Sequence, residues 1–238
     1  MLTAWAQNPL RVPAALTGPT YDLTMAEGAT EILDGVQTVS AGYNGSILGP
    51  TLIMSAGDNV VLNVSNALGE VTTTHWHGMH VSPDNDGGPH SVIEVGATWS
   101  PAFTVRDTAS TMWYHPHLHQ TTNAQVTRGL VGMILVRDEV EAEAGLPRDY
   151  GVDEYPLFLI DRILDGNGQF EVGALGNTLL VNATVDPYLE VPAQMVRFRM
   201  VTRVQCGAGR RAVVQSRGDG WRTARGPTQH DPVDSHAG

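Results

Sequence analysis

The residues with the clearest chemical potential are two pairs of the form His-x-His, His75 with His77 and His115 with His117. In a β-strand, side chains at positions i and i+2 point to the same side, so each pair would aim two imidazoles at one spot. Four neutral imidazoles at one spot would form a transition-metal site, because nitrogen donors suit copper, zinc, iron or nickel. The alternative is two unrelated surface pairs, and the aromatic, proline and glycine neighbours favour the metal site.

Composition limits the classes of protein to which this chain can belong. The chain has 238 residues, enough for one large or two small domains, and 42% are hydrophobic, so a core can form. Its 26 glycines and 14 prolines favour a turn-rich all-β protein. The net charge of -11 argues against a nucleic acid or an anionic membrane as partner. No apolar run is long enough to span a membrane, and Cys206 is the only cysteine, so no intrachain disulfide is possible.

The elements that must position the histidines are short runs of alternating or continuous apolar residues, separated by turns. Alternation with a period of two is the pattern of a half-buried strand. We expect strands at residues 20–25, 36–40, 50–54, 59–65, 72–77, 98–105, 111–115 and 129–136. About eight short strands with turns at regular spacing are typical of a sandwich or barrel.

The spacing of these elements predicts four regions. Residues 1–18 are expected to be an extended lead-in, and residues 19–145 to form a first domain whose acidic stretch at 139–145 is a linker with helical tendency. Residues 146–200 are expected to begin a second domain. Its predicted strands lie at 155–160, 178–181 and 195–200. Three strands cannot close a sandwich, so this second domain is expected to be incomplete.

The chain changes character near residue 200. It contains no lysine, and 8 of its 14 arginines follow residue 196, so the charge balance is -16 up to residue 196 and +5 after it. Residues 201–238 are rich in Gly, Ala, Arg and Pro and show no apolar periodicity, so we expect them to be disordered. A shifted reading frame of a GC-rich gene would encode such a composition, and we therefore hypothesise a truncated product.

Two motifs carry a family resemblance. His-Trp-His-Gly at 75–78 and Trp-Tyr-His-Pro-His-Leu-His at 113–119, with Asp-Gly-Gly-Pro at 86–89 between them, resemble the first two copper motifs of the multicopper oxidases. The resemblance covers about residues 9–200 and is closest to the bacterial copper-tolerance and bilirubin-oxidase-like members. Further matches lie at 43–45, 48–50, 129–132 and, loosely, 177–182.

The resemblance implies an all-β fold, a cupredoxin-like Greek-key sandwich followed by an incomplete second cupredoxin-like domain. It implies copper as cofactor, with His75 on the type 2 copper and His77, His115 and His117 on the type 3 pair. Asp86 is expected beside the ligands, where it would tune bound water or relay protons; the alternative is a plain turn aspartate before two glycines. Copper binding is expected to fall as the histidines protonate towards their unperturbed pKa of about 6.5.

The other histidines and the neighbouring aromatic residues have lesser expected roles. His119 has the parity to face the same side but is not a ligand position in the family, and His80 and His90 are not expected to be ligands either. His230 and His236 lie in the unusual tail and are interpreted as incidental. The aromatic residues Trp76, Trp113 and Tyr114 are expected to wall the site.

The resemblance breaks down at the electron-entry site. In the family a His-Cys-His motif near the C-terminus completes the copper cluster and the type 1 site, and this sequence has no such motif. Cys206 has no flanking histidine and is not expected to bind copper. The type 1 ligands are absent, and half of the cluster's ligands would have to come from elsewhere, with another subunit as one source.

Three functions remain open. The first is the N-terminal fragment of a multicopper oxidase, which couples oxidation of metal ions or phenolic donors to reduction of dioxygen to water and is inactive by itself. The second is a cupredoxin-like module that binds copper or zinc without turnover. The third is a non-catalytic oxidase-like protein of the cell envelope. Family resemblance implies a periplasmic or secreted location, although residues 1–7 are not a complete signal peptide.

Overall fold

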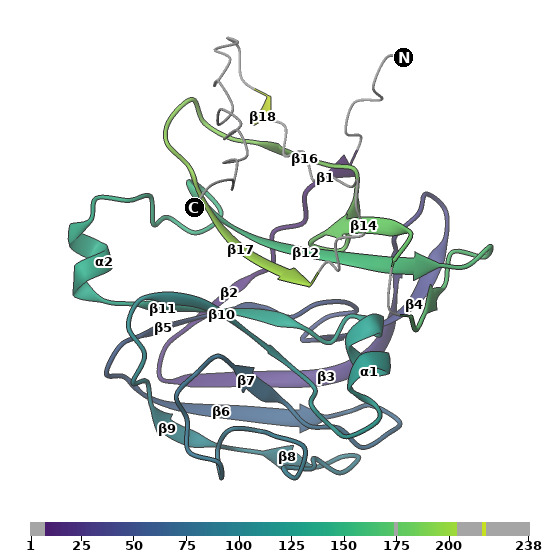
Figure 1. Cartoon of the computed structure of the whole chain (residues 1–238), viewed down its shortest axis with the longest axis horizontal. Coiled ribbons are helices and arrows are strands. Elements are labelled where there is room, and N and C mark those ends of the chain that lie inside the picture. The colour runs from purple at the N-terminus through teal and green to yellow at the C-terminus, as the bar shows by residue number, and fades with distance from the viewer. Residues whose placement is uncertain (1–7, 174–175, 204–215, 218–238) are drawn as a thin grey trace, which may run out of the picture.

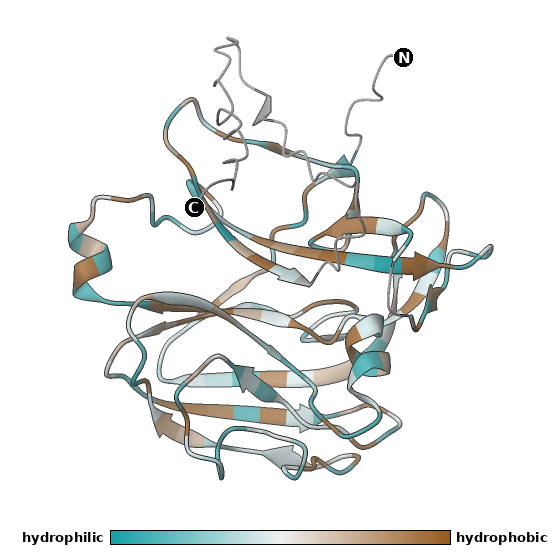
Figure 2. Cartoon of the chain, viewed as in Figure 1, coloured by the Kyte–Doolittle hydropathy of each residue, from teal (hydrophilic) through white to brown (hydrophobic). Residues whose placement is uncertain are grey.

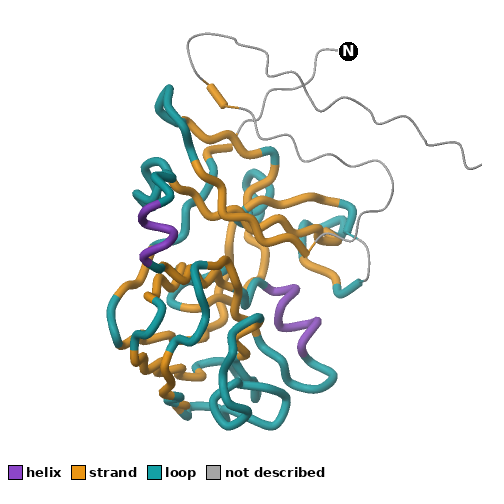
Figure 3. The backbone as a smooth tube through the Cα atoms, turned by 60° about the vertical axis from the view of Figure 1, so that its left-hand side comes forward, coloured by secondary structure: helices purple, strands orange, loops and turns teal. Residues whose placement is uncertain are grey.

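The computed structural model describes residues 8–173, 176–203 and 216–217 as strands, loops and two short helices (Figure 1). Figure 3 shows the two helices lying apart from each other beside the sheets. The expectation of disorder in the tail falls on residues that, apart from 201–203 and 216–217, lie outside those described. Neither helix in this part of the chain is long and apolar enough to cross a membrane.

One layer of the structure is a sheet in the order β4-β3-β6-β8, to which β9 adds by pairing with β6. Its strands are β3 (Thr20–Glu31), β4 (Gln37–Tyr43), β6 (Asn59–Asn66), β8 (Thr98–Trp99) and β9 (Ala102–Thr104). In β6, and in β3 up to Met25, every second residue is buried, as alternation predicts. The inward residues are Tyr21, Leu23, Met25, Val60, Leu62 and Val64.

The second layer is a sheet in the order β2-β5-β11-β10-β7, and it carries three of the four paired histidines. Its strands are β2 (Ala15–Thr17), β5 (Thr51–Ser55), β7 (His75–His77), β10 (Ser110–His115) and β11 (Gly132–Arg137). The strands β10 and β11 pair antiparallel, and so do β10 and β7, whereas β11 and β5 pair parallel.

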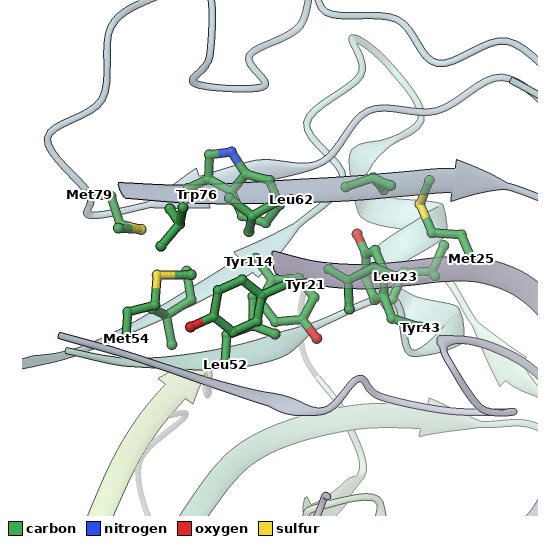
Figure 4. Close-up of a cluster of buried hydrophobic side chains, with 14 of the residues drawn as sticks. Tyr21, Leu23, Met25, Tyr43, Leu52, Met54, Leu62, Trp76, Met79 and Tyr114 are labelled. Atoms are coloured by element: carbon green, nitrogen blue, oxygen red, sulfur yellow. The ribbon is translucent and has the colours of Figure 1, made fainter. Parts of the chain in front are cut away.

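The main core lies between these two sheets. Figure 4 shows Tyr21, Leu23 and Leu62 from one sheet facing Leu52 and Tyr114 from the other. Large side chains fill this space, and Tyr114 also donates a hydrogen bond to the Pro50 carbonyl oxygen, 2.8 Å away. The two sheets therefore form the β-sandwich that the strand pattern predicts.

A third sheet packs on the outer face of the second layer (Figure 1). Its order is β13-β12-β14-β15, with β17 paired to β12. Its strands are β12 (Glu154–Leu164), β13 (Phe170–Glu171), β14 (Thr178–Val181), β15 (Thr184–Val185) and β17 (Arg197–Arg203). Phe158 and Ile160 of β12 belong to one buried cluster with Met133 and Leu135 of β11. Because β11 is covered on both faces, all of its residues are buried, which accounts for its continuous apolar sequence.

Strand β12, which packs against the second layer, is hydrophobic over most of its length (Figure 2). A small parallel sheet adds β1 (Asn8–Pro9), β16 (Pro187–Glu190) and β18 (Ser216–Arg217). The last strand of the third sheet, β17, runs to Arg203, three residues beyond the boundary expected at 200.

The acidic stretch after β11 is more than the linker that its composition indicates. It forms helix α2 (Glu139–Glu143), capped by the Asp138 carboxylate, which accepts from the Glu141 backbone N–H at 2.7 Å. Glu141 is buried because guanidinium groups from distant strands meet it, among them Arg199 at 2.7 Å. That partner is nearly sixty residues away in the sequence, so a local pattern could not reveal it.

Helix α1 (Thr122–Arg128), which the strand pattern does not predict, follows the second histidine pair and buries Gln125. Its C-terminal carbonyl groups at Val126 and Thr127 accept hydrogen bonds from Arg162 of β12, at 2.8 and 3.1 Å. The third sheet thus holds the helix that adjoins the histidines.

Candidate metal site

Strand pairing places the histidines on one face of the second sheet. In the β7–β10 ladder His75 lies opposite His115, and His77 lies opposite Trp113. Residues directly opposite in an antiparallel pair project to the same face of the sheet. His75, His77, His115 and Trp113 therefore share a face, and His117 follows two residues after the end of β10.

The structure brings all four imidazoles together. The His75 ring centroid lies 5.6 Å from those of His77 and His115 and 5.1 Å from that of His117. The centroid of His115 is 5.4 Å from His77 and 5.8 Å from His117. The predicted convergence of the two pairs is thus present in the fold; their role as metal ligands stays a prediction.

Backbone contacts assign the free nitrogen of two rings. His75 Nδ1 lies 2.9 Å from the Asp86 carbonyl oxygen, and His115 Nδ1 lies 2.7 Å from the Pro116 carbonyl oxygen. A carbonyl oxygen can only accept, so each Nδ1 carries the proton and each Nε2 keeps its lone pair. This is how histidine ligands are commonly oriented in metal proteins.

His77 faces the cluster through Nδ1, whereas His75 and His115 have Nε2 free. Its Nδ1 lies 3.3 Å from His115 Nε2. Two imidazole nitrogens bound to one ion at about 2.0–2.1 Å in a tetrahedral arrangement are separated by about 3.3 Å, so this spacing fits two ligands of one ion. Across residues 8–173, 176–203 and 216–217, no three His, Cys, Asp or Glu side chains are arranged to hold one ion.

Burial controls the protonation of two rings. His115 is only 5% exposed, and burial lowers its pKa from 6.5 to about 3, although the hydrogen bond to the Pro116 carbonyl opposes the shift. Burial also lowers the pKa of His77, helped by His75 and His117 and opposed by Asp86. This differs from the expectation that copper binding falls as the histidines protonate towards their unperturbed pKa of about 6.5, because burial, the largest cause, holds the pKa of these two rings lower.

Trp113 is the aromatic wall of the site. Its ring stacks on His115 with centroids 3.9 Å apart, and its centroid is 4.9 Å from that of His77. The expectation that Trp76 and Tyr114 also wall the site is wrong, because both are fully buried in the core between the first two sheets. Strand alternation explains the difference, since residues adjacent to the histidines point to the opposite face.

Asp86 lies beside His75, and its role in tuning bound water or relaying protons stays a prediction. Besides the carbonyl contact, its carboxylate Oδ2 is 3.3 Å from His75 Nδ1. The next residue, Gly87, has φ +73°, and a Cβ there would lie 1.7 Å from the Thr74 carbonyl oxygen. Glycine is required because the loop lies directly against Thr74, the residue before His75.

The remaining histidines have other surroundings. His80 is largely exposed, and its Nδ1 lies 2.5 Å from the buried carboxylate of Asp107. His90 and His119 are exposed. Cys206, His230 and His236 lie outside the described residues.

Comparison with known proteins identifies the family. A family model described as multicopper oxidase matches residues 24–141. The chain is 36% identical over 187 residues to the multicopper oxidase mco of Staphylococcus aureus, covering 76% of this chain and 41% of that protein. It is 37% identical over 207 residues to the cell division protein FtsP of Escherichia coli (strain K12), covering 83% of this chain and 44% of FtsP.

Solved structures of multicopper oxidases are also similar to this chain. A laccase-like multicopper oxidase, CueO from Ochrobactrum sp., superposes with a TM-score of 0.77 at 38% identity, covering 82% of this chain and 46% of that one. The laccase from Pediococcus acidilactici gives 0.78 at 37% identity, with 82% and 45% covered.

The chain belongs to the multicopper oxidase family. The expected all-β, cupredoxin-like fold is confirmed by the sheets of this structure and by these neighbours. The chain spans less than half the length of the curated relatives that it matches. Membership implies copper and oxidoreductase chemistry for the family, and it leaves the activity of this chain to be argued from its own residues.

Proposed function

We propose that this chain is the N-terminal part of a copper-dependent oxidase and supplies four imidazole ligands to its copper cluster. The observation that carries the proposal is the convergence of His75, His77, His115 and His117 from two motifs, with ring centroids 5.1–5.8 Å apart for five of the six pairs. By family resemblance, His75 would hold the type 2 copper and the other three the type 3 pair. Copper bound there would supply the one-electron steps by which four electrons reduce dioxygen to water.

The chain's own residues prepare the cluster for cations. Burial keeps His115 neutral, so its Nε2 lone pair is available over a wide pH range. Trp113 covers one side of the His115 ring and excludes water from it. Asp86 holds His75 through its carbonyl group and places a carboxylate beside the same ring, where it would tune bound water or relay protons.

Electron entry must lie elsewhere in this proposal. The sequence has no His-Cys-His motif, so the type 1 copper and the remaining cluster ligands would come from other residues of the whole protein or from another subunit. A small reducing substrate, either a metal ion or a phenolic donor, is proposed for that whole protein. A periplasmic or secreted location is part of the same proposal. This chain alone is expected to bind copper without reducing dioxygen to water.

Two other functions remain as alternatives. A copper-binding module without turnover would need the same four imidazoles and differs only in the behaviour of the whole protein. A non-catalytic role in the cell envelope is favoured by the match to cell division proteins, which extends over 207 residues. The clustered histidines argue against it, because a purely structural role does not require four imidazoles on one face.

Copper titration of the purified chain tests the proposal. We expect copper binding without intense blue colour, and loss of most of it when His115 and His117 are both replaced by Ala. Replacement of the exposed His90 and His119 by Ala is the matched control and should leave binding unchanged. Copper binding that survives loss of His115 and His117, or steady oxygen consumption with a phenolic donor that is lost in His77→Ala, would overturn the account.

A further inference from the structure

Thr73 lies two residues before His75 and is completely buried. Its hydroxyl oxygen accepts a hydrogen bond from the backbone N–H of His117 at 2.6 Å. This contact joins the segment that leads into the first histidine motif to the second residue of the other pair. The sequence shows only a β-branched run at Thr72, Thr73 and Thr74, which indicates a strand and conceals this role.

The register of the strands explains why a side chain makes this bond. The β7–β10 ladder pairs His115 with His75, so continuing it by two residues places His117 opposite Thr73. Pro116 lies between His115 and His117, and the regular strand β10 ends at His115. A hydroxyl from Thr73 replaces the missing backbone partner and satisfies the His117 N–H.

The hydroxyl is held on a rigid segment. Thr72 donates to the Gln125 side-chain oxygen at 2.8 Å, and the Gln125 amide donates back to the Val71 carbonyl at 3.0 Å. Gln125 is itself fully buried on helix α1. The backbone of Thr72 is held too, because its carbonyl oxygen accepts a hydrogen bond from the Ile93 N–H at 2.8 Å.

We propose that Thr73 is a positioning residue that holds the exposed His117 imidazole against His75 for metal binding, an inference that rests on the proposed function. The two ring centroids lie 5.1 Å apart, and His117 is outside the regular strand, so its backbone has no ladder to fix it. Loss of the hydroxyl releases the backbone at His117 and widens this separation. Bringing the ring back when metal binds then costs conformational entropy.

Three variants separate this role from simple packing. Thr73→Val removes the hydroxyl at constant shape, Thr73→Ser keeps it, and Thr74→Val is the matched control. Thr74 is equally buried and adjacent to His75, but its hydroxyl faces Tyr43, 3.2 Å away. Copper affinity and the Cu(II) electron paramagnetic resonance spectrum are measured for each variant beside its thermal stability.

We expect Thr73→Val to weaken copper binding by about tenfold or more, the range seen when a partner of a metal ligand is lost, and to change the Cu(II) spectrum. Thr73→Ser should match the wild type, and Thr74→Val should lose no more than about threefold in affinity. Equal losses in Thr73→Val and Thr74→Val, or a loss in Thr73→Ser as large as in Thr73→Val, would overturn the inference.

Hydrogen exchange tests the contact without metal and without any variant. The His117 amide of the wild-type chain should be protected from exchange although its side chain is exposed. An unprotected amide would refute the contact even if Thr73→Val failed to fold. If the wild-type chain binds no copper, the proposed function fails and this inference fails with it. If the wild-type chain binds copper and Thr73→Val binds it equally well, only this inference fails.

Discussion

At the scale of single residues, His115 shows how burial sets the chemistry of the site. It lies against Trp113 and three other imidazoles, and its Nδ1 is committed to the Pro116 carbonyl. A proton on Nε2 would add a charge in a crowded, poorly hydrated place, so burial depresses its pKa. The same alternation that aims His75 and His77 at this site sends the intervening Trp76 into the core.

A first prediction concerns pH and the metal-free chain. The folded pKa of His115, about 3, lies below the unfolded value of about 6.5, so the unfolded chain binds the proton more readily. The contribution of His115 to the free energy of unfolding is therefore complete above pH 6.5 and declines as the pH falls towards 3. The slope for one such group is at most about 1.4 kcal/mol per pH unit.

Urea unfolding between pH 3 and 7 measures this slope. His115→Gln should flatten it, and the exposed His119→Gln is the matched control for loss of an imidazole. A slope unchanged in His115→Gln would mean that this ring is protonated as easily in the folded chain as in the unfolded one.

A second prediction concerns Gly87. A Cβ at this position meets the Thr74 carbonyl oxygen at 1.7 Å, so Gly87→Ala must push the Asp86 loop away from His75. Gly96 has nearly the same backbone, φ +76° against +73°, and a Cβ there would have no atom within 4 Å, so Gly96→Ala isolates the cost of the left-handed conformation. We expect about 1–2 kcal/mol for Gly96→Ala and a further 1–3 kcal/mol or more for Gly87→Ala.

Denaturant unfolding and copper titration of both variants give the comparison. Only Gly87→Ala should also weaken copper binding, because only it moves the partner of His75. Equal effects of the two substitutions on stability and on copper would show that the loop does not position His75.

At the scale of elements, alternation predicted the strands well and the connections between them poorly. The expected strand at 98–105 is divided into β8 and β9 around Pro101, because proline cannot donate to a ladder. The expected strand at 72–77 is regular only over β7: before it, Thr72 makes a single bridge to Ile93, and the hydroxyl of Thr73 accepts from the His117 N–H. Helix α1 has no apolar stripe that a period could reveal, since its buried residues include Gln125 and Thr127.

The third prediction concerns the buried ion cluster that joins α2 to the third sheet. Glu154 is fully buried, with Arg199 Nε 2.7 Å away, and it also pairs with Arg137. Glu154→Gln keeps the shape but removes one of the two carboxylates beside Arg137 and Arg199, so that of the two only Glu141 still pairs with them. We expect a loss of about 3–5 kcal/mol in the free energy of unfolding. The exposed Glu171→Gln, also in a strand, is the control and should cost under about 0.5 kcal/mol. A Glu154→Gln loss as small as that of the control would show that the cluster contributes little.

At the scale of the whole molecule, the third sheet is a cover for the sheet that carries the histidines. Phe158 of β12 packs edge-on against Trp113, with ring centroids 5.9 Å apart, and Arg162 caps the helix that follows His117. Sequence reasoning predicted that the four imidazoles converge, because strand alternation and a family motif can both be read from neighbouring residues; their role as metal ligands stays a prediction. It could not place Thr73, Gln125 or the ion cluster, whose partners lie far away in the sequence.

The most direct test of the central claim is anomalous diffraction from a copper-soaked crystal of this chain. We predict a copper peak within coordination distance of His77 Nδ1 and His115 Nε2, the two nitrogens 3.3 Å apart, and loss of that peak in the His115→Ala variant. Copper found only at other residues, such as the exposed His80, with nothing between these rings, would contradict the account.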